Sequence, residues 1–169
     1  MNEYFLRDWR VEDCHSIVKY ANNRLIANNL RDGFPHPYSI SDAEKFIENA
    51  ISQNEKTMFA IANKFEAIGS IGLFKGNDVH RLSAEFGYWL GEPFWNKGIV
   101  TNILEKFVKY AFEELKLIRL HAEPYYTNTA SIRVLEKAGF QYEGRLRSSV
   151  IKNNEILDQL IYAKIRKVT

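Results

Sequence analysis

The stretch Glu85–Lys116, EFGYWLGEPFWNKGIVTNILEKFVKYAFEELK, decides how this chain folds. It opens with alternating large residues, Phe86, Tyr88 and Leu90, which predict a strand. A loop with glycine and proline follows, and apolar residues then recur at helical spacing over 103–115. A strand that enters a helix through a glycine-containing turn leaves N–H groups unpaired at the helix start. Those groups and the helix dipole favour an anion such as phosphate. An ordinary strand–loop–helix connection is the alternative explanation of the same glycines.

Composition limits the class of protein. With 169 residues, 46% of them hydrophobic, the chain has enough apolar surface for a core, and we expect residues 1–169 to form a single domain. The net charge of +2, with both signs interleaved, argues against nucleic-acid binding, which needs clustered Lys and Arg. One cysteine, Cys14, excludes an internal disulfide and suits a cytoplasmic protein. We expect no membrane partner, because no apolar run approaches the roughly 20 residues of a membrane span.

Ahead of the opening stretch, the pattern predicts one strand, three helices and a pair of strands. Ser41 and Glu44 have the spacing of a capping box, which predicts that the third helix starts there and runs to about Gln53. Its inward face is expected to carry Ala43, Phe46, Ile47, Ala50 and Ile51. The other expected elements are strands at 4–7, 57–62 and 67–75, with helices at 13–21 and 24–30.

Behind the opening stretch, residues 118–122 read as a strand. A helix separates this strand from the one before it, so the two should be parallel and joined by a right-handed crossover. Thr127 or Asn128 should cap a helix that reaches Ala138 and stops at Gly139. Residues 140–152 and 156–165 should form an antiparallel hairpin, with two asparagines in the turn. The order of elements predicts an α+β domain with a mixed central sheet.

Two motifs connect this chain to a known family. The run NTASIRVLEKAGF at 128–140, followed by Tyr142-Glu143-Gly144, resembles the second cofactor motif of the GNAT acetyltransferase superfamily. FWNKGIVT at 94–101 resembles its pyrophosphate loop, with Trp95 and Val100 at the first and last places of the loop pattern and Gly98 kept. The chain is most similar to the RimJ/RimL type, which acetylates ribosomal-protein alanine, and HRLSAEFGYWL at 80–90 also resembles bacterial spermidine acetyltransferases.

The resemblance implies a fold and a co-substrate. The fold would be α+β, with a mostly antiparallel central sheet, helices on both faces and a splayed parallel strand pair. Acetyl-CoA would bind with its pyrophosphate on main-chain amides of the loop and its pantetheine arm along the strand at 88–90. Lys97 could add charge, or could be an ordinary exposed lysine. The Asn128 side chain would bond pantetheine, and a helix N-cap is its alternative role. The implied cofactor-binding residues are Tyr88, Trp89, Leu90, Trp95, Asn96, Lys97, Gly98, Ile99, Val100, Thr101, Asn128, Leu135 and Lys137.

Three residues are the catalytic candidates. Acetyl transfer to an amine needs a neutral amine, a held oxyanion and a proton for the thiolate. Glu85, a carboxylate between apolar strand residues, is the candidate base, and an ion pair with Arg81 or Lys75 is its alternative role. The resemblance implies that the Leu90 amide holds the thioester oxygen. Leu135 stands where many family members carry a tyrosine acid. RimL-like enzymes have a serine at the place of Ser131, and the resemblance therefore implies Ser131 as the candidate acid.

Other groups remain in reserve for these roles. Tyr125, Tyr126 and Tyr142 are alternative proton donors. The histidines at 36, 80 and 121 have no metal-ligand spacing, and we expect no metal.

The leading hypothesis is therefore an acetyl-CoA-dependent N-acetyltransferase that works by direct attack in a ternary complex. Its acceptor would be a primary amine, with a protein N-terminus favoured and a diamine or polyamine as the rival. A non-catalytic acyl-CoA-binding module is the alternative from another class. We expect the loop at 31–39 and the last hairpin to select the acceptor, and the resemblance also allows a homodimer.

Overall fold

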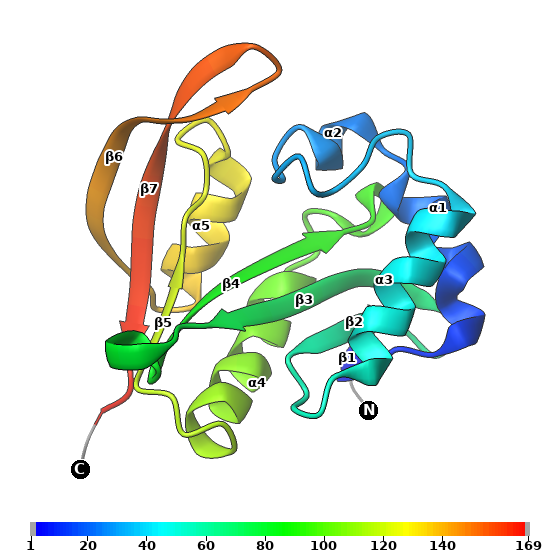
Figure 1. Ribbon diagram of the computed structural model, residues 1–169, viewed down its shortest axis with the longest axis horizontal. Helices are drawn as coiled ribbons and strands as arrows, with labels where there is room; N and C mark the ends of the chain where they lie inside the picture. The colour runs from blue at the N-terminus through cyan, green and yellow to red at the C-terminus, as the bar shows by residue number, and fades with distance from the viewer. Residues whose placement is uncertain (1–2, 168–169) are drawn as a thin grey trace. The chain divides into compact units, whose positions relative to one another are not determined.

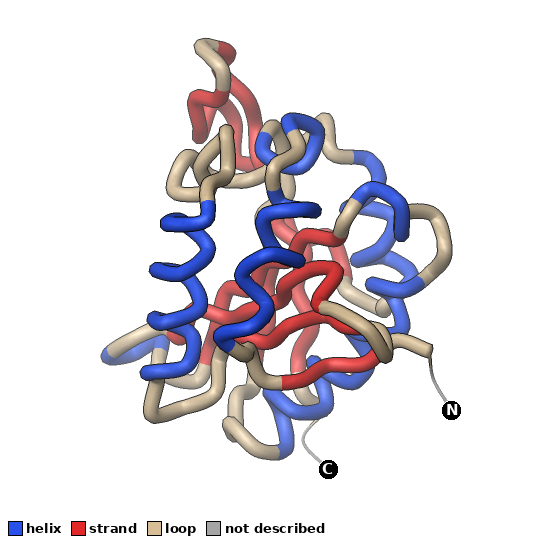
Figure 2. Tube along the Cα trace, turned by 90° about the vertical axis from the view of Figure 1, so that its right-hand side faces the viewer, coloured by secondary structure: helices blue, strands red, loops and turns tan. Residues whose placement is uncertain are grey.

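A computed structural model describes residues 3–167 and shows a mixed sheet accompanied by helices (Figures 1 and 2). Among those residues, seven strands follow the order β1-β2-β3-β4-β5-β7-β6. Neighbouring strands are antiparallel where a register is given, except for β4 and β5, which are parallel. The predicted order of elements and the predicted parallel pair are both confirmed.

The bounds of the elements lie close to those predicted. The strands are β1 Phe5–Arg7, β2 Met58–Ala62, β3 Ala67–Lys75, β4 Ser83–Leu90, β5 Arg119–Ala122, β6 Gln141–Lys152 and β7 Glu155–Ile165. The α-helices are α1 Cys14–Ala21, α2 Arg24–Ala27, α3 Ile40–Ser52, α4 Ile99–Glu113 and α5 Thr129–Lys137. Short 3-10 turns occur at Val11–Asp13, Asp78–His80 and Glu92–Phe94.

The chain divides into two compact units. The first unit contains the residues up to Gly72 together with Tyr88–Ile99. Its core is built from side chains of α1, α3, β2 and β3, and the Trp9 ring meets Phe46 edge-on at 5.2 Å between centroids. The largest fully buried side chains of this core are those of Ile17, Ile47, Ile61, Ile68 and Ile71.

Two details of α3 differ from the prediction. The capping box is formed by Ser39 and Asp42, because the Ser39 hydroxyl accepts from the Asp42 amide at 3.2 Å while Asp42 accepts from the Ser39 amide at 2.8 Å. The predicted pair at Ser41 and Glu44 has the same spacing, but both residues lie inside the helix. Ile51 was expected to face inward and is 44% exposed, because the core-facing side of the helix ends with Ala50.

The second unit contains Leu73–Gly87 and the residues from Val100 onward. Here α4 packs on the sheet through Phe107, whose ring lies 6.1 Å from that of Phe86. The end of α5 is tied to β7, since the Tyr162 hydroxyl donates to Glu136 at 3.0 Å and the Lys164 ammonium donates to the Ala138 carbonyl at 2.7 Å. Gly139 follows with a φ of +79°, which ends the helix as predicted.

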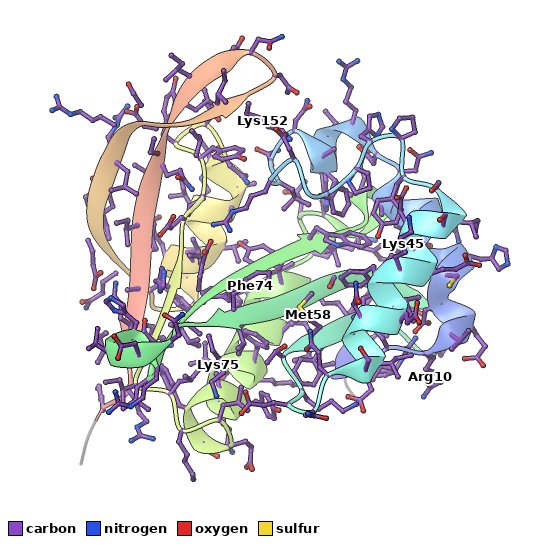
Figure 3. All side chains as sticks on the ribbon, in the orientation of Figure 1. Arg10, Lys45, Met58, Phe74, Lys75 and Lys152 are labelled. Carbon is purple, nitrogen blue, oxygen red and sulfur yellow. The ribbon has the colours of Figure 1, made fainter. Side chains whose placement is uncertain are left out.

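The β6–β7 hairpin closes this unit (Figure 1). Its turn is Asn153-Asn154, with φ values of +51° and +65°, a left-handed conformation that asparagine tolerates well. Lys152 stands directly before the turn, near the tip of the hairpin in Figure 3, and is buried. An irregularity in β6 lies between Leu146 and Val150. Asp158 holds it by accepting from the Ser148 amide at 2.7 Å, and that bond followed by the Arg145 contact lowers the pKa of Asp158.

A glycine on β3 controls how closely β4 can approach. A Cβ added to Gly69 would lie 2.4 Å from the Trp89 carbonyl oxygen and 3.1 Å from the Leu90 Cα, which are backbone atoms that cannot rotate away. We therefore expect Gly69→Ala to lower the free energy of unfolding by about 1–3 kcal/mol, the usual range for overpacking. Urea unfolding of the purified variant measures this change.

Gly87→Ala on β4 is the matched control, since a Cβ there meets nothing within 4 Å. It should leave the free energy of unfolding unchanged or slightly raised. Equal stabilities of the two variants would contradict the proposed role of Gly69.

Candidate active site

The end of β4 is held tightly inside the first unit. Trp89 and Leu90 are buried and Tyr88 is half-buried. The Gly91 amide donates to the Ile68 carbonyl at 2.8 Å, so the chain stays paired with β3 until β4 ends. These three residues are the ones expected along pantetheine, and the structure gives them a fixed backbone.

The loop after β4 is closed by a bond that the sequence did not reveal. The Trp95 indole N–H donates to the Leu90 carbonyl at 2.7 Å and so spans the turn at Glu92–Phe94. The Asn23 side chain donates to Glu92 at 2.5 Å, which ties the same turn to the start of α2. Trp95 therefore has a structural task, and this task explains a tryptophan at the first place of the loop pattern.

The backbone of the next turn is shaped for anions. Asn96 has a φ of +60° and Gly98 a φ of +70°, whereas the residue between them has no such left-handed φ. Alternation of handedness along successive residues turns their N–H groups toward one side, as in anion-binding nests. All three residues of the turn are exposed, and a Cβ on Gly98 would meet nothing within 4 Å. The Lys97 ammonium lies over the Phe94 ring at 5.6 Å from its centroid.

The helix α4 begins directly after this turn. Its first turn carries no acidic side chain, so only the positive end of the helix dipole acts there. Ile99 and Val100 are buried and Thr101 is half-buried. The β-branched Val100 side chain is therefore part of the buried core of the second unit.

Glu85 lies in the second unit at the end of the parallel ladder. The register pairs Ser83 with Arg119 and ends with Glu85 opposite His121. Residues that face each other in this register project to the same side of the sheet. Glu85 is half-buried, and its role as a base stays a prediction.

The start of α5 brings two predicted residues together. The Asn128 side chain accepts from the Ser131 amide at 3.2 Å, so the N-cap role of Asn128 is confirmed. Its side-chain nitrogen does not take part in that bond, so the cap and a bond to pantetheine are compatible. Leu135 is fully buried and Lys137 is exposed. The cofactor roles of these last two residues stay predictions, and complete burial does not favour that of Leu135.

The reserve tyrosines differ in their surroundings. Tyr125 is buried, whereas Tyr126 is 42% exposed and lies beneath the Arg145 guanidinium at 5.1 Å. Tyr142 is exposed and packs edge-on against Tyr162 at 5.6 Å between centroids. Within residues 3–167, no group of three or more His, Cys, Asp or Glu side chains is arranged to hold a metal ion. Over the same residues, none of the helices has the length and apolar character that crossing a membrane requires.

Comparison with known proteins identifies the class. The family described as Acetyltransferase (GNAT) domain matches residues 4–141, which is most of the chain. The probable N-acetyltransferase YjcK of Bacillus subtilis is 35% identical over 131 residues, covering 75% of this chain and 72% of YjcK. The chain therefore belongs to the GNAT acetyltransferase family. It is an acetyl-CoA-dependent N-acetyltransferase, which agrees with the resemblance seen in the two motifs.

Other relatives differ in what their names say of the acceptor. An uncharacterized N-acetyltransferase p20 of Bacillus licheniformis is 27% identical, covering 96% of this chain and 92% of its own. The spermidine N(1)-acetyltransferase of Escherichia coli is 26% identical over a match that covers 89% of this chain and 79% of that enzyme.

Solved structures share the fold. The structure of the microcin C7 self immunity acetyltransferase MccE with acetyl-CoA and AMP superposes with a TM-score of 0.84 at 28% identity, covering 98% of this chain and 94% of that one. RimL, a ribosomal L7/L12 alpha-N-protein acetyltransferase in complex with coenzyme A, gives a TM-score of 0.86 at 20% identity. The match covers 98% of this chain and 95% of the RimL chain.

The two functions of Asn128 can be separated by mutation. Asn128→Ala removes the cap and should lower the free energy of unfolding by about 1 kcal/mol. Asn128→Asp keeps an oxygen for the Ser131 amide and should retain the stability. It removes the N–H donor and adds a negative charge, so acetyl-CoA should bind at least about tenfold more weakly, or about 1.4 kcal/mol.

Thermal unfolding and calorimetry of both variants provide the two readouts. If Asn128→Asp binds acetyl-CoA as tightly as the parent, Asn128 acts only as a cap.

Proposed function

We propose that this enzyme acetylates the N-terminal amine of a protein, by direct attack of the amine on acetyl-CoA in a ternary complex. The observation that carries the proposal is the turn at Asn96 and Gly98 that opens α4. Its alternating backbone and the adjoining helix dipole suit the pyrophosphate of coenzyme A. The similarity to RimL adds support for a protein substrate, through the fold that the two chains share.

Within this proposal, acetyl-CoA is held mainly by main-chain groups. The amides of Asn96–Thr101 bind the pyrophosphate, and the strand residues Tyr88–Leu90 pair with pantetheine. The Asn128 side-chain nitrogen donates to the same arm. Because these contacts use backbone atoms, they tolerate unusual side chains such as Trp95.

The chemical steps are assigned to three groups. The Leu90 amide stabilises the oxyanion, Ser131 gives a proton to the departing thiolate, and Glu85 takes a proton from the amine. The cap places the Ser131 amide against Asn128, which fixes the start of the helix that carries the proposed acid. We also propose a cytoplasmic location, which the single cysteine suits, and the family resemblance allows a homodimer.

A diamine or polyamine acceptor is the second candidate. It is favoured by the relative named as a spermidine acetyltransferase and by two carboxylates next to His121: Glu85 faces it in the parallel register, and Glu123 lies 3.8 Å from its ring. Carboxylates on one face suit a substrate with several ammonium groups.

A thiol-release assay over a panel of amines tests the proposed function. A short peptide with a free N-terminal alanine should release coenzyme A with a kcat/KM at least about tenfold above that of spermidine, about 1.4 kcal/mol in transition-state binding. The same peptide with a blocked N-terminus is the control and should release none. Preference for spermidine would replace the protein acceptor by a polyamine.

Substitutions of Gly98 test whether acetyl-CoA binds at the turn that precedes α4. Acetyl-CoA should raise the Tm of the parent, since it binds the folded chain. Gly98→Glu places a carboxylate into the open space at the turn and should abolish that rise. Gly98→Asn is the matched control, because asparagine tolerates a φ of +70° and brings no charge.

For the Gly98 variants, calorimetry decides the outcome. Equal acetyl-CoA affinity of folded Gly98→Glu and the parent would exclude this turn as the pyrophosphate site.

A further inference from the structure

The loop at 91–95 joins the end of β4 to the turn that opens α4, and Trp95 closes this loop. The Trp95 indole N–H donates to the Leu90 carbonyl at 2.7 Å, and the Trp95 main-chain amide donates to the Glu92 carbonyl at 3.1 Å. The next residue is Asn96, the first left-handed residue of the turn. One half-buried side chain therefore ties the last residue of β4 to the start of the proposed pyrophosphate site.

The direction of the Leu90 carbonyl follows from the peptide bond that contains it. The N–H of the same peptide belongs to Gly91 and donates to the Ile68 carbonyl of β3 at 2.8 Å. A planar trans peptide points its C=O and its N–H in opposite directions, so the Leu90 carbonyl points away from β3. The Leu90 amide lies on the same edge, since both main-chain groups of one strand residue face the same neighbour. The Trp95 indole therefore binds β4 on the edge that the proposed pantetheine arm uses.

Other contacts brace the loop without using the indole N–H. The Phe94 ring packs edge-on against the Tyr20 ring, with 5.4 Å between the centroids. Gly91 lies against that same ring, since an added Cβ would be 2.9 Å from one of its carbons. The Asn23 side chain donates to Glu92 at 2.5 Å. Loss of the indole N–H should therefore loosen the loop without unfolding the first unit.

The contacts proposed for acetyl-CoA lie on both sides of this loop. The pantetheine arm is proposed along 88–90, and the pyrophosphate on the amides of 96–101. A ligand that occupies two subsites gains from its own linkage only when the subsites stay at the spacing of the linked ligand. A loose loop removes part of that gain, because binding must then order the loop. The affinity for the whole ligand should thus depend on how firmly 91–95 is held.

We propose that Trp95 is a positioning residue, whose indole N–H fixes the spacing between the pantetheine strand at 88–90 and the pyrophosphate turn at 96–98. This inference rests on the proposed function, from which it takes the two subsites. The indole acts through the Leu90 main chain and takes part in no bond-making or bond-breaking step. Its removal weakens acetyl-CoA as a whole, whereas each half of the molecule binds nearly as before.

The test removes the N–H and keeps the ring. Benzothienylalanine in place of Trp95 has sulfur where the indole has N–H and nearly the same shape, and Trp95→Phe is the second variant. Calorimetry should show acetyl-CoA binding both variants about tenfold more weakly than the parent, the order of one lost hydrogen bond. The KM for acetyl-CoA should rise, and kcat at saturation should stay within about twofold, because the bound ligand restores the loop.

Two partial ligands provide the readout that a general loss of stability would not give. ADP probes the pyrophosphate turn as an inhibitor that competes with acetyl-CoA, and S-acetylpantetheine probes the strand as an acetyl donor. The inhibition constant of ADP and the kcat/KM of S-acetylpantetheine should each change by less than about twofold in the variants, since neither ligand spans the loop.

Trp9→Phe is the matched control. The Trp9 indole N–H is buried and has no hydrogen-bond partner within residues 3–167, so this change removes ring volume and no such bond. It should lower the Tm, because it leaves a cavity in the core of the first unit, and it should leave the affinity for acetyl-CoA unchanged. A weaker affinity in the Trp95 variants then cannot be attributed to lower stability.

Two results would overturn the inference. One is an unchanged affinity for acetyl-CoA in both Trp95 variants. The other is a loss for ADP or for S-acetylpantetheine as large as the loss for acetyl-CoA, which would mean that Trp95 shapes a single subsite. A parent that binds no acetyl-CoA, or that releases no thiol with any amine, defeats the proposed function as well. An active parent whose Trp95 variants keep its affinity defeats this inference alone.

Discussion

The parallel pairing of β4 with β5 lasts for only three residue pairs, and the arrangement of the candidate site depends on that short ladder. Parallel strands need a crossover connection, and α4 supplies it. The remaining residues of β4, 86–90, lie outside the parallel register. Their end is instead held by β3, through the Gly91–Ile68 hydrogen bond and the close approach at Gly69. The end of β4 therefore has a fixed backbone, and we propose that the pantetheine arm lies along it.

The two helices next to the predicted cofactor residues begin in different ways. The start of α5 is capped by a side chain, since Asn128 accepts from the Ser131 amide. The start of α4 follows a turn shaped by backbone conformation, with left-handed residues at Asn96 and Gly98. Backbone geometry depends little on the identity of exposed side chains. Trp95, which is half-buried, has a structural task instead, because its indole N–H donates to the Leu90 carbonyl.

Local patterns in the sequence were enough to predict the element order, the parallel pair and the turn residues. Helical and strand periodicity act over a few residues, and Gly139 and Asn128 have strong local preferences that the structure uses. The predicted start of α3 was wrong, because Ser39 and Ser41 both satisfy the capping rule. Only the packing of the helix determines which of the two serines becomes the cap.

Contacts between distant residues could not be predicted from those patterns. The Trp95–Leu90 bond depends on how one loop folds back, and the network around Gln159 joins residues from three separate segments. Glu123 carries no motif, and the spacing of His121 was considered only for metals. His121 faces Glu85 only through the register of β4 with β5, which a sequence pattern does not specify beyond its direction.

Gln159 on β7 is a buried amide whose hydrogen bonds join three segments of the second unit. Burial of an amide is compensated only when its hydrogen bonds are made, and the net gain from each is about 1 kcal/mol. Replacement of all partners by apolar groups of the same shape is often neutral or stabilising. A leucine at 159 alone would leave the Ser149 hydroxyl and the Glu123 carbonyl without their bonds to Gln159. Gln159 does what leucine cannot: with Ser149 on one end of the amide, it directs its nitrogen at the Glu123 main chain and carboxylate. The network thus fixes the Glu123 carboxylate, whose side chain is 23% exposed, to β7 and to the segment that follows β5.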